Sequence, residues 1–134
     1  MKNPADIGVL IPTRNCASLL PGHVQSLEPW LDLAAEVVVV DSESTDGTVE
    51  FLQKHLRHPN VRFLPHPRGL YQSWNFGIRN LHPKYTYIST VGDSITRDGL
   101  MHLHQVAEEF QCDVAVSKPD FLDAEGRPQP PTRW

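Results

Sequence analysis

Three polar motifs hold the side chains that could do chemistry in this chain: PTRN at 12–15, DSESTDGT at 41–48 and GDS at 92–94. Asp41 offers a carboxylate that can accept a hydrogen bond from a base or a ribose, so we expect it to contact a ligand. Asp93 could bind Mg²⁺ or Mn²⁺, because these ions take one or two carboxylates together with phosphate oxygens. These residue types predict a nucleotide site.

Each motif also has a purely structural interpretation. PTRN can be a turn in which Thr13 or Asn15 caps the following helix. Ser44 to Gly47 fits an Asx turn and a helix N-terminus, which itself favours an anionic ligand, and we expect Asp46 to be structural. Asp93 can equally be a turn residue that bonds its own backbone. Both interpretations stay open for the three motifs.

The elements that must position these motifs follow from the apolar pattern. Apolar or β-branched runs predict strands at 7–11, 36–41, 61–64, 85–91 and 113–117, and helical spacing predicts helices at 17–28, after 44–46, at 69–81 and after Thr96. The expected inward residues are Leu20, Val24 and Leu27; Val49, Leu52 and Leu56; Tyr71, Trp74, Ile78 and Leu81; and Leu100, Leu103, Ala107 and Phe110. This alternation predicts an α/β fold with a mostly parallel sheet and helices on both faces.

The polar motifs fall at one kind of place in this pattern. PTRN follows the first expected strand, DSESTDGT the second and GDS the fourth. Ligands of open parallel sheets bind outside the carboxyl ends of the strands. We therefore expect the three motifs to meet in one site. The aromatic pair Tyr71 and Trp74 fits core packing better than a cofactor pocket, although Tyr71 could reach the site.

Composition excludes several classes of protein. The 134 residues suit a globular domain, and the net charge of −4 with scattered Lys and Arg disfavours nucleic acid or an anionic membrane as partner. No apolar stretch approaches the roughly 20 residues that span a bilayer, and residues 1–6 lack the apolar core of a signal peptide. These features, and two distant cysteines expected to be reduced thiols, indicate a cytoplasmic protein. The seven histidines complete no ligand set, and we expect them on the surface.

The ordered motifs resemble the N-terminal half of family 2 glycosyltransferases. The matching segments are IGVLIPTRN, VVVVDSESTDGT, GLYQSWNFGI and YISTVGDS, which cover nearly the whole chain. The resemblance implies a Rossmann-like GT-A fold, the fold of nucleotide-diphospho-sugar transferases. It also implies a nucleoside-diphosphate sugar donor, a divalent cation (Mn²⁺ or Mg²⁺), and transfer of the glycosyl group to an acceptor hydroxyl with inversion.

Carried over by position, the resemblance assigns ten residues to the nucleotide-sugar site. These are Pro12, Thr13, Arg14 and Asn15 at the base pocket, Asp41 on the base with Glu43 and Ser44 nearby, Tyr71 and Asn75 on the third helix, and Asp93 in the metal motif. The chain departs from the family pattern in two of its motifs, besides the missing acceptor-binding half. Ser42 stands where a second acidic residue is common, and Gly92 and Ser94 flank a lone aspartate, which leaves one carboxylate for the cation.

The resemblance also implies a division of the chain. Residues 1–119 are expected to be the donor-binding domain, and residues 120–134 a loop-like tail toward an acceptor-binding half that supplies the catalytic base. The ending PTRW reads as a point where the chain is cut, and an uncovered sheet edge or helix face could pair two copies. The sequence does not indicate the nucleobase or the sugar of the donor, nor the acceptor.

Three other functions compete with this one. A degenerate module that binds nucleotide sugar or a partner without catalysis fits the reduced GDS motif. A haloacid-dehalogenase-type phosphatase is disfavoured, because Glu43 stands two residues after Asp41 and Asp46-Gly47-Thr48 comes too late. A dinucleotide oxidoreductase is disfavoured by the absence of a G-x-G-x-x-G motif after the first strand.

Overall fold

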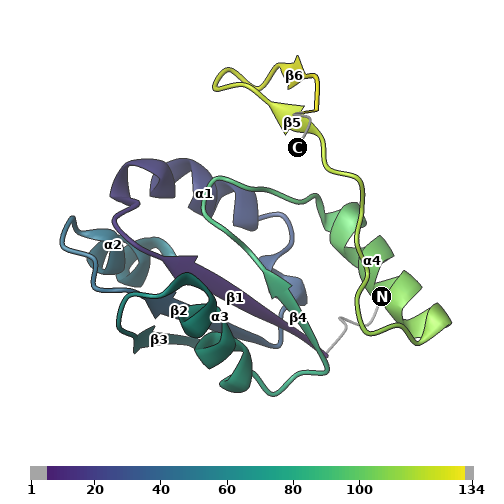
Figure 1. Cartoon of the computed structure of the whole chain (residues 1–134), viewed down its shortest axis with the longest axis horizontal. Coiled ribbons are helices and arrows are strands. Elements are labelled where there is room, and N and C mark those ends of the chain that lie inside the picture. The colour runs from purple at the N-terminus through teal and green to yellow at the C-terminus, as the bar shows by residue number, and fades with distance from the viewer. Residues whose placement is uncertain (1–5, 132–134) are drawn as a thin grey trace. The chain divides into compact units, whose positions relative to one another are not determined.

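A computed structural model of the chain describes residues 6–131. Residues 6–100 form one compact unit and residues 101–131 another, and each is described here by itself (Figure 1). The polar stretch at 1–5 and the last residues of the PTRW ending, 132–134, lie outside the described residues. The predicted division of the chain at residue 119 stays a prediction.

A four-stranded parallel sheet forms the centre of the first unit. It consists of β1 (Ile7–Thr13), β2 (Glu36–Asp41), β3 (Val61–Pro65) and β4 (Tyr85–Ile88) in the order β3-β2-β1-β4. Four of the five predicted strands are thereby confirmed. The last of them ends at Ile88, short of the predicted residue 91, because a turn begins at Thr90, whose carbonyl accepts the N–H of Asp93 at 3.0 Å.

Helices lie on both faces of this sheet, as predicted (Figure 1). The elements are the 3-10 turns η1 (Ala17–Leu19) and η2 (Leu31–Leu33) and the helices α1 (Leu20–Leu27), α2 (Thr48–His55), α3 (Leu70–Arg79) and α4 (Arg97–Phe110). Right-handed connections place α1 and α2 on one face, while the connection from β3 across to β4 places α3 on the other. The predicted helix over 17–28 is a 3-10 turn continued by a shorter α-helix.

Strand β2 is buried on both faces because it lies inside the sheet with helices above and below. Leu10, Val38 and Val40 pack toward α3 together with Trp74 and Ile88. Residues of the opposite parity face α1 and α2, where the rings of Trp30 and Tyr87 meet edge to face at 5.4 Å. The continuous apolar run of β2 is therefore explained by two-sided burial.

The predicted inward stripe of α3 is wrong in two of its members. Tyr71 is 71% exposed and Ile78 39% exposed, whereas Ser73 and Gly77 face the sheet. A Cβ at position 77 would collide with Leu10 and approach Val40. The helix therefore lies too close to the sheet for large side chains at its point of contact, and small residues take the inward positions.

Helix α1 also differs from its predicted face. His23 is 3% exposed and points inward with Leu20 and Leu27, while Val24 is only half-buried. Spacings of three and four residues both fit one helix face, so periodicity did not separate the two. The expectation that the histidines lie on the surface is wrong for His23.

The second unit contains the rest of α4 and a small hairpin. The predicted strand over 113–117 is absent, and Val114 and Val116 are 75% and 83% exposed, since no neighbouring strand among residues 101–131 pairs with this run. Instead β5 (Phe121–Leu122) and β6 (Pro128–Gln129) pair antiparallel within the stretch predicted to be loop. Phe110, predicted to face inward, is 70% exposed.

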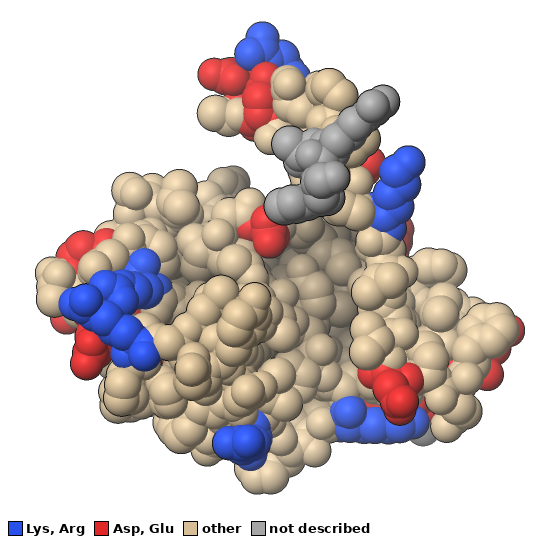
Figure 2. Space-filling view, viewed as in Figure 1, with Lys and Arg blue, Asp and Glu red and all other residues tan. Residues whose placement is uncertain are grey.

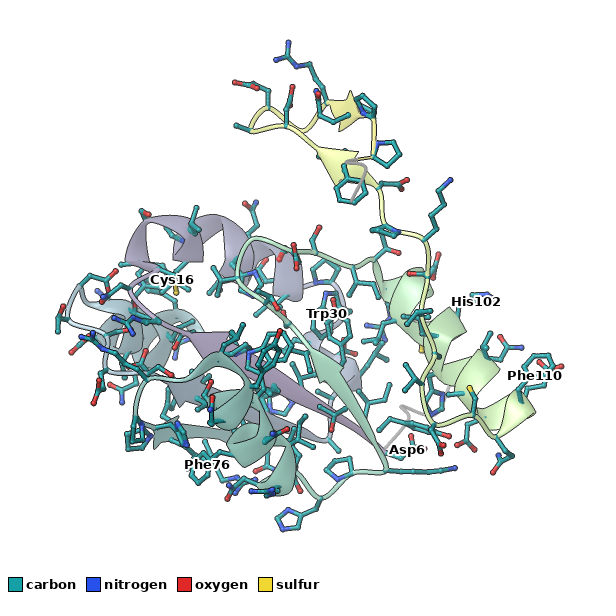
Figure 3. The ribbon with its side chains drawn as sticks, in the orientation of Figure 1. Asp6, Cys16, Trp30, Phe76, His102 and Phe110 are labelled. Atoms are coloured by element: carbon teal, nitrogen blue, oxygen red, sulfur yellow. The ribbon has the colours of Figure 1, made fainter. Side chains whose placement is uncertain are left out.

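Charged groups of both signs are distributed in small, separate clusters over the face of the molecule shown in Figure 2. Within residues 6–131 no helix has the length and apolar character needed to cross a bilayer. Cys16 and Cys112 are free, half-buried thiols, and Cys16 lies in the connection between β1 and α1 (Figure 3).

Candidate functional site

The carboxyl ends of the strands bring the predicted motifs together. Strands β2, β1 and β4 are neighbours, and the register pairs Thr13 at the end of β1 with Asp41 at the end of β2. The loops that follow β1, β2 and β4 therefore leave the sheet at the same edge. PTRN and DSESTDGT are in direct contact there, through three sets of hydrogen bonds.

Asp41 is the centre of the first set. Its Oδ1 accepts hydrogen bonds from the hydroxyls of Thr13 at 2.8 Å and Ser44 at 2.6 Å, and its Oδ2 accepts the backbone N–H of Ser44 at 2.9 Å. Both carboxylate oxygens are thus used within the protein. Asp41 joins β1 to the loop after β2, and its remaining lone pairs are what it can offer to a ligand.

Asn15 forms the second set of contacts. Its backbone N–H donates to Ser44 Oγ at 2.8 Å, and its Oδ1 accepts the N–H of Thr45 at 2.8 Å. Asn15 and Glu43 have φ angles of 43° and 58°, in the left-handed region that few non-glycine residues adopt. The two hydrogen bonds of Asn15 hold that residue in this conformation.

Asp46 and Thr48 form the third set. Asp46 accepts the N–H of Ala17 at 3.0 Å and the hydroxyl of Thr48 at 2.6 Å, and Thr48 in turn accepts the N–H of Cys16 at 3.0 Å. Asp46 also accepts the N–H of Thr48 at 3.1 Å, as expected for a residue at the start of α2. The hydroxyl of Thr48 and the amide of Ala17 lower the pKa of Asp46, while burial raises the pKa of Cys16.

A cavity of about 310 Å³ opens beside these loops, on the side of the sheet that carries α3. Its lining residues are Pro12, Thr13, Arg14, Ser42, Gly69, Leu70, Ser73, Trp74 and Thr90. It lies where the chain order reverses between β1 and β4, the point at which open α/β sheets bind ligands. Three of the ten predicted site residues, the ones at 12–14, form part of its wall.

The other predicted site residues do not line this cavity. Asn15, Asp41 and Ser44 belong to the hydrogen-bonded loops next to it. Tyr71, one residue beyond the lining residue Leu70, is exposed and meets Trp74 edge to face at 6.3 Å between ring centres. The following two lie elsewhere on exposed surface: Asn75 on α3 and Asp93 in the loop after β4.

Sequence reasoning did not identify six lining residues, at 42, 69, 70, 73, 74 and 90. It also missed Arg68, which forms an exposed ion pair with Glu43 at 3.2 Å next to lining residues Ser42 and Gly69. The sequence partly indicated these residues, because Gly69 follows β3 and begins α3. Residues one turn further along a helix lie on the same face as its first residues, so Ser73 and Trp74 could have been expected beside Gly69 and Leu70.

Asp93 is the residue that the sequence assigned to a cation. It is exposed, and no side chain within the described part of the chain hydrogen-bonds or pairs with its carboxylate, unlike that of Asp41. A single carboxylate fits Mg²⁺ or Mn²⁺ when phosphate oxygens and water complete the six ligands. Asp93 alone supplies one ligand, so a cation here would also need the oxygens of a bound diphosphate.

Comparison with known proteins gives a consistent result. Residues 8–134 match Glycosyl transferase family 2. The uncharacterized glycosyltransferase MG025 homolog of Mycoplasma pneumoniae is 32% identical over 113 residues, 81% of this chain and 38% of that protein. Glycosyltransferase GlyA of Streptococcus pneumoniae is 27% identical over 123 residues, 90% of this chain and 18% of that protein. The chain thus spans less than half the length of these relatives.

Solved structures share the fold. The mannosyltransferase PcManGT from Pyrobaculum calidifontis, in complex with GDP-Man and Mn²⁺, superposes with a TM-score of 0.67 at 26% identity and covers 76% of this chain and 32% of its own. TarS 1–349 of S. aureus with UDP-GlcNAc gives 0.67 at 22% identity, over 79% of this chain and 32% of its own. The sheet with its helices has the arrangement of GT-A enzymes. On the match of residues 8–134, the chain belongs to glycosyl transferase family 2.

Proposed function

We propose that this chain is the donor-binding part of a glycosyltransferase that transfers a sugar from a nucleoside diphosphate to an acceptor hydroxyl with inversion. The observation that carries the proposal is the cavity at the carboxyl edge of the sheet, bordered by cross-linked loops. Family membership and the complexes of PcManGT and TarS with nucleotide sugars support it.

The residues around the cavity suit the parts of such a donor. Pro12, Thr13 and Trp74 offer flat or apolar walls for a base, and Asp41 holds this wall in place. The first turn of α3 borders the cavity, and a helix N-terminus together with the guanidinium of Arg14 stabilises the negative charge of a diphosphate. None of these residues is assigned as the general base that deprotonates the acceptor.

A cation on Asp93 would supply charge neutralisation for the departing diphosphate, and the Mn²⁺ complex of PcManGT supports this role. Asp93 would bind that cation through its exposed carboxylate. We place the general base that deprotonates the acceptor in an acceptor-binding half beyond residue 119. With the base on one side of the anomeric carbon and the diphosphate on the other, direct displacement inverts that carbon.

Calorimetric titration of the chain with UDP-, GDP-, CDP- and dTDP-sugars, in Mn²⁺ and then in EDTA, tests this function. We expect selective binding of one nucleotide, and a stability gain of about 2.7 kcal/mol at 100 times its dissociation constant. Mn²⁺ should strengthen binding in the wild type and have no effect in Asp93→Ala. Absence of binding by every nucleotide would overturn the proposal.

A matched pair of variants locates the site. Leu70 lines the cavity and is 60% exposed, and Leu122 lies in the β5–β6 hairpin and is 57% exposed. Leu70→Asp places a negative charge where we expect the diphosphate, and should weaken binding by about tenfold or more. Leu122→Asp should bind like the wild type. Equal effects of the two variants would place the nucleotide somewhere else.

A further inference from the structure

A buried histidine and a buried serine meet below the loop that carries Asp93. His23 on α1 is 3% exposed, Ser89 directly after β4 is 2% exposed, and Nε2 of the histidine lies 3.2 Å from Oγ of the serine. None of the roles assigned above uses either residue. Their contact joins α1 to the end of β4 across the face of the sheet opposite the cavity.

Burying a histidine at this position costs folding free energy. Burial lowers its pKa, and the nearby charge of Asp93 opposes that shift. Its Nδ1 is buried without a hydrogen-bond partner among residues 6–131. An apolar side chain would fill the same space without leaving a polar atom unpaired. A polar ring here therefore points to a need for its bond with Ser89.

Ser89 stands at the point where β4 gives way to the site. Its backbone N–H donates to Leu10 at 2.8 Å, and the next residue, Thr90, lines the cavity. The carbonyl of Thr90 accepts the N–H of Asp93 at 3.0 Å. A short path of bonded groups thus connects His23 to the cavity wall and to the proposed cation ligand.

We propose that His23 is a positioning residue: through its hydrogen bond to Ser89 it fixes the end of β4, and so sets where Thr90 and the Asp93 carboxylate lie relative to the cation and diphosphate. This inference rests on the proposed function for the role of Asp93. The hydrogen bond restrains the loop whether or not a nucleotide is bound, which makes the two separately testable.

The first experiment follows amide hydrogen exchange in the ligand-free chain. His23→Leu keeps the site apolar and filled, and Ser89→Ala removes only the hydroxyl. We expect both variants to speed exchange about tenfold at the amides of Ser89 and Asp93, which donate to the carbonyls of Leu10 and Thr90. His58→Leu is the control, because it removes the side-chain hydrogen bonds of His58 to the carbonyl of Ala34 and from the N–H of Asn60, and leaves His23 and Ser89 untouched. Unchanged exchange in His23→Leu and Ser89→Ala would overturn the inference.

The second experiment separates positioning from general stability. Nucleotide affinity is measured with Mn²⁺ and with EDTA in each variant. In His23→Leu, the factor by which Mn²⁺ strengthens nucleotide binding should fall about tenfold, the usual scale for groups that orient a metal ligand. Its affinity in EDTA should stay unchanged. His23→Gln, whose amide can still hydrogen-bond with the hydroxyl of Ser89, should recover most of the gain. A parallel loss in Mn²⁺ and EDTA, or no recovery with Gln, would contradict a positioning role.

The two experiments also distinguish a failure of the proposed function from a failure of the inference about His23. A wild-type chain that binds no nucleotide, with faster loop exchange in His23→Leu, would refute the proposed function and leave the restraint by His23 standing. A wild-type chain that binds nucleotide with Mn²⁺, and whose His23→Leu variant keeps the full Mn²⁺ gain, would refute the inference alone.

Discussion

Two loop regions at the same edge of the sheet are held in very different ways. The loop clasp, defined as Thr13, Asn15, Asp41, Ser44, Asp46 and Thr48, is joined across the loops after β1 and β2 by hydrogen bonds of 2.8–3.0 Å. The β4 loop, residues 89–95, is held at its start by Ser89 and, within the described part of the chain, by one turn bond from the N–H of Asp93 to the carbonyl of Thr90. The clasp is built before any ligand arrives, while among residues 6–131 the acidic group of the β4 loop has no hydrogen-bond or ion-pair partner.

This difference suits the two ends of a nucleotide sugar. A base and ribose are the constant part of the ligand, and a preformed wall binds them without the entropic cost of ordering a loop. A cation between carboxylate and diphosphate needs a ligand that can still adjust and that no protein group already occupies. The structure thus separates a rigid recognition region from an available charged one.

The largest expected loss of stability follows from the removal of Asp41, the centre of the clasp. Asp41→Ala leaves the N–H of Ser44 and two hydroxyls without their acceptor, and we expect the free energy of unfolding to fall by about 3 kcal/mol. Denaturant titration measures it. Glu43→Gln in the same loop touches only the exposed ion pair with Arg68, and should cost under about 1 kcal/mol. Equal losses in both variants would contradict the central role of Asp41.

Sequence patterns predicted the framework of the site better than its contacts. The apolar runs of β1 and β2 located two strands, and their ends showed where the polar motifs would meet. The bonding of Asp41 to Thr13 joins residues 28 positions apart, and no local periodicity encodes such a pair. The sequence therefore indicated Asp41 as a ligand contact without revealing that the protein already uses both its oxygens.

The inward faces of the helices were predicted less well for a related reason. On α3 the close approach to the sheet selects Ser73 and Gly77, which carry no apolar signal. On α1 a histidine takes a place that periodicity allowed equally to Val24. The run at 113–117 has the composition of a strand, but a strand forms only where a neighbour pairs with its backbone. These outcomes depend on tertiary contacts.

An intermediate effect on the free energy of unfolding is expected when acid protonates Asp46 in the clasp. The folded-state pKa of Asp46 is lowered, first by the hydroxyl of Thr48 and next by the N–H of Ala17. Its ionised carboxylate therefore stabilises the fold at neutral pH, and this contribution disappears as the pH falls below about 4 through the lowered value. Asp46→Asn should be less stable than the wild type at pH 7, and the difference should close toward pH 3.

Carboxyl titration followed by NMR checks the cause. Thr48→Val removes the hydroxyl and should move the pKa of Asp46 back toward its ordinary value, while Thr48→Ser retains the hydroxyl and should leave the pKa low. A wild-type Asp46 carboxyl that titrates at or above the ordinary value would show that the clasp is not held through this charge. Its contrast with the β4 loop would then rest on Asp41 and Asn15 alone.

The smallest expected effect on stability is that of Asp93→Ala in the β4 loop. Its side chain is exposed and, within the described residues, makes no hydrogen bond or ion pair, so the free energy of unfolding should change by less than about 0.5 kcal/mol. Thermal and denaturant unfolding without metal measure it, with Asp41→Ala as the opposite reference. A loss above about 1 kcal/mol would mean that the carboxylate already has a structural partner. In that case the β4 loop would be built like the clasp, and its aspartate could bind a cation only by giving up that partner.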